Sequence, residues 1–250
     1  MKDKYELAKE ASELRKRLGD DDRSPVDIFR LAHTIDNLTL VFYPMGDNIS
    51  GMCIKTAKNI IVAINSSMSY GRQRFTMAHE LYHCYFDDDT DTTVCPINID
   101  SNNDVEKEAN LFASFFLAPP ASLSDEIKKY RYKAGALDIS GVVELEQLFG
   151  LSRRAMLTRL IDEKALDEPE ATSMKTAVIS SAAALGYDDT LYRPAQNEKQ
   201  QITYGKYIKS AGQLIECELI SYGKYEELLL DAFRHDIVYG NDNAGGELVD

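Results

Sequence analysis

Apolar positions recur along the N-terminal part of the chain with two different periods, which predict helices and strands in turn. Helical spacing over residues 4–18 predicts a first helix. Three short strand-like runs follow at 38–43, 49–55 and 59–65, with turn residues between them, and each predicts a strand. Helical spacing returns from about Tyr70 to Phe86. We therefore expect a small sheet with helices before and after it.

Prolines mark helix boundaries on both sides of this region. Ser24-Pro25 is typical of a helix start, because serine caps a helix and proline suits its first position. Pro119-Pro120 ends a helical run that starts at residue 104, and an amphipathic helix is expected over 124–133. The chain after Asp167 has a mostly helical pattern and is more acidic than the rest.

Two short helices joined by a glycine turn are expected between residues 139 and 166. The first ends at Gly150 and the second is capped by Ser152, an arrangement that looks like a helix-turn-helix. A helix that binds DNA needs a basic surface. In this segment the acidic and basic residues are equal in number, so we expect the two helices to pack against the rest of the protein rather than to bind DNA. The acidic residues are Glu144, Glu146, Asp162 and Glu163, and the basic residues are Arg153, Arg154, Arg159 and Lys164.

Composition and charge narrow the function classes. Apolar residues make up 44% and charged residues 28% of the 250, the balance of an ordinary globular protein. The chain has no apolar run long enough to span a bilayer, and the first residues lack the apolar segment of a secretory signal, so a cytoplasmic location is expected. The formal net charge of −13 disfavours binding to nucleic acid or to an anionic membrane, and favours a protein or peptide partner.

The four cysteines are scattered, without a C-x-x-C pair, which argues against a disulfide framework and against a structural zinc site made of thiolates. Cys84 follows His83 directly. On a helix it points about 100° away from its neighbour, so a buried thiol is the better interpretation than a metal ligand.

The run His79-Glu80-Leu81-Tyr82-His83 carries the clearest chemistry in the chain. Residues four apart lie one turn apart on the same helix face, so His79 and His83 can bind one ion together. Zinc lowers the pKa of a bound water, and Glu80 is placed to accept its proton during attack on a carbonyl group. The pattern therefore predicts a catalytic zinc site.

A catalytic zinc needs a third protein ligand, and three candidates are present. Asp89 stands where compact zinc peptidases place a last ligand, but their tight turn requires glycine at the position of Phe86. Glu106 is favoured, because Asn110 shares its helix face and can accept the outer N–H of a ligating histidine. Glu108 lies on the opposite face of that helix and remains an alternative.

These two motifs together resemble the ImmA/IrrE family of zinc metallopeptidases. The first is Phe75-Thr76-Met77-Ala78 followed by the HExxH run, and the second extends from Glu106 to Pro119. The resemblance covers about residues 20–166, and it departs where Tyr82 replaces a common glycine and Ala118 a common methionine. It implies a zincin-like core, a gluzincin-like Glu106 as the third ligand, and cleavage of a regulatory protein. Such a substrate is typically a repressor of a phage or mobile element, or another DNA-binding transcription regulator.

The expected fold is α+β: a zincin-like core with a small mixed or antiparallel sheet and the HExxH helix, then a helix-turn-helix-like segment and a mostly helical extension. We assign residues 1–135 to the metallopeptidase domain, 136–167 to the helix-turn-helix-like segment, and 168–250 to an acidic extension of unknown role.

The expected function is that of a zinc-dependent endopeptidase acting on a repressor-like or antitoxin-like protein, with Glu80 as general base. Its substrate would pair with an exposed strand at 49–54, and Tyr70, Tyr82 or Tyr132 would assist the oxyanion. The alternative is a metal-stabilised regulator that binds its partner without cutting it, and a DNA-binding regulator is a more distant one.

Overall fold

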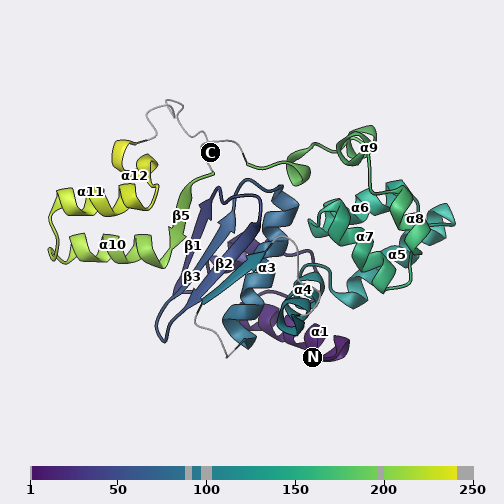
Figure 1. Cartoon of the computed structure of the whole chain (residues 1–250), viewed down its shortest axis with the longest axis horizontal. Coiled ribbons are helices and arrows are strands. Elements are labelled where there is room, and N and C mark those ends of the chain that lie inside the picture. The colour runs from purple at the N-terminus through teal and green to yellow at the C-terminus, as the bar shows by residue number, and fades with distance from the viewer. Residues whose placement is uncertain (1, 88–91, 97–102, 196–199, 241–250) are drawn as a thin grey trace.

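The computed structural model describes residues 2–87, 92–96, 103–195 and 200–240. Its centre is a five-stranded sheet with strand order β4-β2-β3-β1-β5. Figure 1 shows α5–α9 beyond α4 on one side of the sheet and α10–α12 beyond β5 on the other. The elements are α1 (Lys4–Arg17), α2 (Ile28–Ala32), β1 (Leu38–Tyr43), β2 (Ile49–Lys55), β3 (Ile60–Asn65), α3 (Tyr70–Phe86), β4 (Thr92–Pro96), α4 (Asp104–Leu117), α5 (Pro120–Ala134), α6 (Ile139–Phe149), α7 (Arg153–Asp162), α8 (Glu168–Ser173), α9 (Val178–Ala184), the 3-10 helix η1 (Thr190–Tyr192), β5 (Ile202–Gly205), α10 (Lys206–Glu216), α11 (Tyr222–Asp231) and α12 (His235–Tyr239).

The sheet is mixed. β1 runs parallel to β3, whereas the pairs β1–β5, β2–β3 and β2–β4 are antiparallel. The prediction of an α+β fold with a small mixed sheet, an HExxH helix and helical segments after it is confirmed. Within the described ranges, no helix is both long enough and apolar enough to cross a lipid bilayer.

Two strands were not predicted from the sequence, and one of them changes the expected mode of substrate binding. β4 pairs with β2 on the side away from β3, so β2 lies inside the sheet. The expectation that residues 49–54 form an exposed strand is therefore wrong, because both edges of β2 are already paired. β4 is short and follows an acidic run, so its sequence carries little periodicity.

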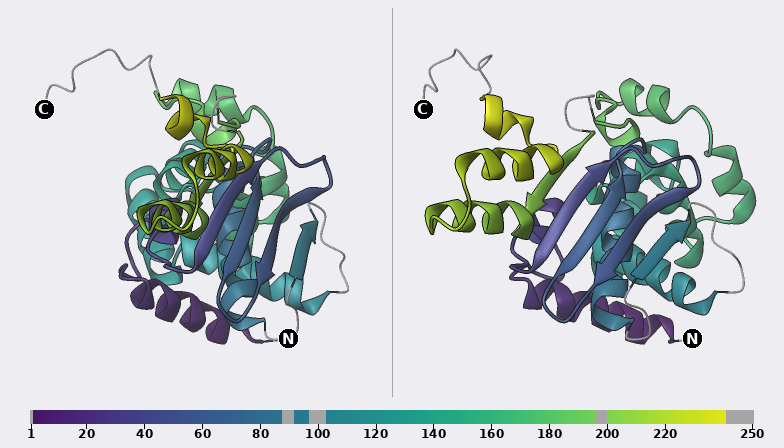
Figure 2. Two further views of the ribbon diagram at one scale, coloured as in Figure 1. Left: turned by 90° about the vertical axis from the view of Figure 1, so that its left-hand side faces the viewer. Right: turned by 60° about the vertical axis from the view of Figure 1, so that its left-hand side comes forward.

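The second unpredicted strand, β5, comes from the part of the chain assigned to the C-terminal extension. It pairs antiparallel with β1, and α10 packs against both strands. Figure 2 shows the yellow-green helices that follow β5 at this edge of the sheet. The division of the chain at residue 168 stays a prediction, although β5 links the extension to the central sheet.

One helix start differs from the prediction. α2 begins at Ile28, and its N-cap is Asp27, whose carboxylate accepts a hydrogen bond from the backbone N–H of Arg30 at 3.2 Å. The predicted cap, Ser24, has another role, because its carbonyl oxygen accepts a hydrogen bond from Arg15 at 2.5 Å. A carboxylate is as good a cap as a hydroxyl, and it outcompetes the serine here.

The core lies between the sheet and a layer of helices. α3 packs against β2 and β3, α4 packs against α3, and α1 packs against α4. The side chains between them are aromatic and aliphatic, including Met77, Leu81, Phe112 and Phe116, which are fully buried. Burial of this apolar surface is the main source of stability, at about 25 cal/mol per Å2. It also fixes α3 and α4 side by side.

The helix-turn-helix-like segment is attached to α3 through buried polar contacts. Arg74 of α3 donates to the carbonyl oxygens of Gly150 at 3.1 Å and Val26 at 2.6 Å. Gly150, the turn residue between α6 and α7, has a left-handed backbone (φ 65°), which glycine adopts without strain. Arg153 forms a buried ion pair with Glu146, so this arginine is held inside the protein.

Gly51 of β2 determines how closely the sheet approaches α3. A Cβ atom at this position would lie 2.6 Å from Thr76 Cγ2, 2.9 Å from Glu80 Oε1 and 2.9 Å from the carbonyl oxygen of Ala63. These separations are shorter than van der Waals contact, so only glycine allows the strand to lie directly on the HExxH helix.

We expect Gly51→Ala to lower the free energy of unfolding by about 1–3 kcal/mol, because the added methyl group forces the strand and the helix apart. Urea unfolding followed by circular dichroism measures this change. Gly46→Ala is the matched control, since a Cβ there meets nothing within 4 Å. Equal stability of the two variants would contradict the close approach.

Candidate metal centre

Helix α3 brings the two histidines and the glutamate of the HExxH run into the interior. His79 and His83 lie one turn apart, and their Nε2 atoms are 3.1 Å from each other. Both imidazoles are buried, and Glu80 between them has no exposed surface (0%). The helical spacing thus produces the convergence expected from the sequence.

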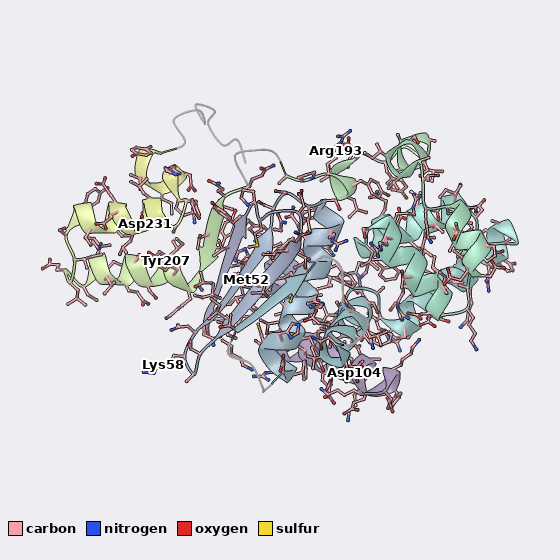
Figure 3. All side chains as sticks on the ribbon, in the orientation of Figure 1. Met52, Lys58, Asp104, Arg193, Tyr207 and Asp231 are labelled. Carbon is pink, nitrogen blue, oxygen red and sulfur yellow. The ribbon has the colours of Figure 1, made fainter. Side chains whose placement is uncertain are left out.

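Helix α4 supplies the carboxylate that meets these two rings. Glu106 Oε2 lies 3.2 Å from His79 Nε2, and Glu106 Oε1 lies 3.4 Å from His83 Nε2. Asn103 caps α4 by accepting hydrogen bonds from the backbone N–H groups of Val105 and Glu106. Figure 3 labels the first helical residue, Asp104, at the start of α4. The cap therefore fixes the turn that carries Glu106.

The outer nitrogen of each ring has its own acceptor. His79 Nδ1 lies 3.3 Å from Asn110 Oδ1, and the Asn110 amide is oriented by donating from Nδ2 to the carbonyl oxygen of Glu106 at 2.6 Å. His83 Nδ1 lies 3.0 Å from Asp87 Oδ2. Because both acceptors are oxygens, each Nδ1 is the protonated nitrogen of its neutral ring. Each Nε2 then directs a lone pair into the space beside Glu106.

This arrangement fits a metal ion. Two imidazole lone pairs and one carboxylate face the same point, and electron pairs of this kind converge only around a proton or a cation. Burial alone lowers the pKa of His83, but the carboxylates of Glu106 and Asp87 outweigh it and raise that pKa. Burial likewise opposes ionisation of Glu106, yet the two histidines lower its pKa to about 2. The site therefore favours an ionised carboxylate with positive charge beside it.

Glu80 has surroundings different from those of Glu106. Within the described ranges, neither of its carboxylate oxygens has a hydrogen-bond partner of standard geometry. Burial raises the pKa of Glu80, and His79 partly opposes the change. A buried carboxylate whose oxygens lack hydrogen bonds of standard geometry is costly, so such a group is retained where it serves chemistry.

Glu108 and Asp89 were the alternative candidates for the third metal ligand. Glu108 lies away from the histidines, and its Oε2 accepts a hydrogen bond from the Tyr82 hydroxyl at 2.6 Å. The other, Asp89, falls outside the described residues. Of the acidic residues weighed on α4, the structure brings Glu106 to the histidines.

Sequence reasoning missed two residues at this site. Asp87 is one helical turn after His83, and that spacing was a usable signal that the acidic run around it concealed. Cys95 lies on β4. Its sulfur and the ligand atoms of His79, His83 and Glu106 all lie within 4.8 Å of one another. No local pattern indicates Cys95, because a strand pairing brings it there. The expected buried role of Cys84 is consistent with its contact to Cys53 (Sγ to Sγ, 3.0 Å).

The three tyrosines considered for the oxyanion do not line the cavity described below. Tyr82 is buried, and its hydroxyl donates a hydrogen bond to Glu108. Tyr132 is 94% exposed on α5, and the ring of Tyr70 packs against Phe29. The donors that face this cavity come from other residue types.

A cavity of about 480 Å3 opens beside His79, between α3, α4 and α7. Its charged lining is mainly basic, in contrast to the net charge of −13 for the whole chain. Arg159 is buried in its wall with its guanidinium 4.5 Å from the ring centroid of Phe115, and burial lowers the pKa of Arg159. The lining residues are Ser50, Arg72, Phe75, Thr76, His79, Lys107, Asn110, Leu111, Ser114, Ser152, Arg154, Ala155, Thr158, Arg159 and Asp162.

We expect Asp87→Ala and Asn110→Ala each to weaken divalent-metal binding by about 10- to 100-fold, because each removes the acceptor that orients one imidazole. Competition with a chromogenic chelator measures the dissociation constant. Asp36→Ala, an exposed carboxylate outside the site, is the control and should leave the constant unchanged. Unchanged affinity in both test variants would contradict the orienting role.

The part of the chain that holds this site is similar to known proteins. The family model described as an IrrE N-terminal-like domain matches residues 37–160, which include the histidine pair, Glu106 and the greater part of the helix-turn-helix-like segment. The radiation response metalloprotease IrrE of Deinococcus deserti is 28% identical over 109 residues. That alignment covers 42% of this chain and 37% of the relative, so the match spans well under half of either protein. Residues 37–160 thus form an IrrE N-terminal-like domain, and the chain belongs to the ImmA/IrrE family.

Proposed function

We propose that this protein is a zinc-dependent endopeptidase that hydrolyses a peptide bond in a regulatory protein. The convergence of the Nε2 atoms of His79 and His83 with the carboxylate of Glu106, next to a buried Glu80, is the observation that carries the proposal. Two imidazoles and one carboxylate are a standard donor set for catalytic zinc.

The residues of the site divide into those that would bind the ion and those that orient the binding side chains. His79, His83 and Glu106 would bind zinc, while Asn110 and Asp87 keep both imidazoles in the tautomer that leaves Nε2 free. Zinc, when bound, lowers the pKa of water and polarises a carbonyl oxygen. The membership of the ImmA/IrrE family supports a metal at this site.

Glu80 is assigned the role of general base. Its burial raises its pKa, which makes its carboxylate a stronger acceptor for the proton of the attacking water. As the water oxygen bonds to the carbonyl carbon and the C–N bond breaks, Glu80 passes that proton to the leaving amine. Its place on the helix, one residue after His79, keeps it beside the reacting atoms.

The cavity beside His79 is suited to a polypeptide segment. It is continuous with the site through His79 and Asn110, and Phe75 and Leu111 give it apolar walls. Arg154 is exposed at this cavity, so its basic lining favours substrate segments that carry Asp or Glu. With β2 paired on both sides, the substrate lies against this cavity rather than beside β2.

The class of substrate comes from the family. The resemblance to this family implies a repressor or another DNA-binding regulator as substrate, and the relative in Deinococcus deserti is named a radiation response metalloprotease. We propose a transcription regulator, repressor-like or antitoxin-like, as the partner of this chain. An acidic protein repels DNA, so recognition is directed at the regulator's protein surface rather than at its operator.

We expect Glu80→Gln to keep its zinc and to lose cleavage by at least about 100-fold, because the amide cannot accept the proton. Zinc content is measured by elemental analysis, and cleavage by comparing protein N-termini in cells that express wild type or variant. Glu144→Gln, on the exposed side of α6, is the matched control and should cleave as wild type does. Acidic residues flanking the new N-terminus would support the role of the basic cavity.

Two other results would count against this function. Full cleavage by Glu80→Gln would remove Glu80 from the mechanism. Identical N-termini in both cultures, with the same regulator co-purifying with both forms, would favour the alternative of a metal-stabilised binding protein that does not cut its partner.

A further inference from the structure

Cys95 lies at the metal centre, but the proposed mechanism gives it no role. The Cys95 side chain is 1% exposed, and its sulfur lies within 4.8 Å of the ligand atoms of His79, His83 and Glu106. Within the described ranges, this is the group of residues placed to hold a metal ion. A thiolate is also a good zinc ligand.

The sheet directs Cys95 toward the site. In the register of β2 and β4, Cys95 is opposite Gly51, and directly opposed residues point their side chains to the same face. That face is the one on which a Cβ at Gly51 would meet Glu80 Oε1 at 2.9 Å. The absence of a side chain at Gly51 therefore leaves room for the thiol above α3.

The neighbours of Cys95 differ from those of the other buried thiols. Cys53 and Cys84 belong to the hydrophobic core and contact each other, as expected for small apolar fillers. Cys95 is equally buried but is not part of that core, and the carboxylates of Glu80 and Glu106 lie near it. A role as a core filler does not explain a thiol beside two carboxylates and two imidazoles.

We propose that Cys95 binds the same divalent ion as a fourth protein ligand, so that His79, His83, Glu106 and Cys95 close the site. The inference rests on the proposed metal centre. On binding, the thiol loses its proton to solvent and its sulfur bonds to the ion. A zinc site with four protein ligands is closed, whereas a catalytic site keeps one position for water.

A closed site makes the protein latent in the described conformation, and β4 is the element that opens it. Among the residues that the structure describes, β4 is at the edge of the sheet and its backbone pairs with one neighbour, β2. Movement of β4 away from α3 breaks that one ladder and withdraws Cys95 from the ion. Binding of the substrate protein at this edge would supply the contacts that replace the ladder.

Cobalt substitution tests the ligation directly. We expect the Co2+-loaded wild type to show a sulfur-to-cobalt charge-transfer absorption in the near ultraviolet, and Cys95→Ser to lose it. Cys217→Ser is the control, because that thiol is exposed at the end of α10 and its removal should leave the band intact. The zinc dissociation constant of Cys95→Ser should rise by about tenfold or more, since loss of an orienting neighbour alone costs that much.

Three results would overturn the inference: no such band in wild type, a band that persists in Cys95→Ser, or failure to bind cobalt at all. Cys95→Ala provides a second variant, and circular dichroism checks that each variant is folded. If the spectra behave as expected but neither wild type nor Cys95→Ser cleaves any protein, the peptidase proposal fails and the ligation by Cys95 stands. Faster cleavage by Cys95→Ser than by zinc-loaded wild type would support latency.

Discussion

Three electron-pair donors meet in a buried space between α3 and α4, and much of the structure around them exists to hold them there. The Nε2 atoms of His79 and His83 are 3.1 Å apart, and both lie within 3.4 Å of the Glu106 carboxylate. Such groups stay together only around positive charge. The cost of keeping them buried is offset by the ion they bind and by the packing that surrounds them.

The supporting structure acts at two levels. Asn110 and Asp87 fix the imidazole tautomers through hydrogen bonds, and the Asn103 cap fixes the turn that presents Glu106. Beyond them, the aromatic contact between Tyr82 and Phe112 packs α3 against α4. Because Gly51 has no side chain, strand β2 can lie directly against Glu80. The result is a buried site at one end of a basic cavity.

How much of this was predictable depends on the distance over which each contact acts. The HExxH spacing works within one helix, so the histidine pair and its helix, Tyr70–Phe86, follow from the sequence without reference to the rest of the fold. Glu106 required an assumption about how a second helix returns, and the helix face shared with Asn110 favoured it over Glu108. Its approach to the histidines is a consequence of α3–α4 packing.

The features that escaped prediction arise from strand pairing. Cys95 and Gly51 come together through β4, and β5 pairs with β1 from a distant part of the chain. Short strands carry little periodicity, so neither their existence nor their register could be derived locally. Asp87 is different, since its one-turn spacing from His83 was visible but was one acidic residue among several.

Whether α3 and α4 together hold one metal ion can be seen by anomalous X-ray scattering at the zinc absorption edge. Crystals of the full chain grown with equimolar zinc should give one strong anomalous peak in contact with His79 Nε2, His83 Nε2 and the Glu106 carboxylate. A zinc peak bound through Glu108 or elsewhere on the chain, with none between the two histidines, would show that these helices do not form the metal site.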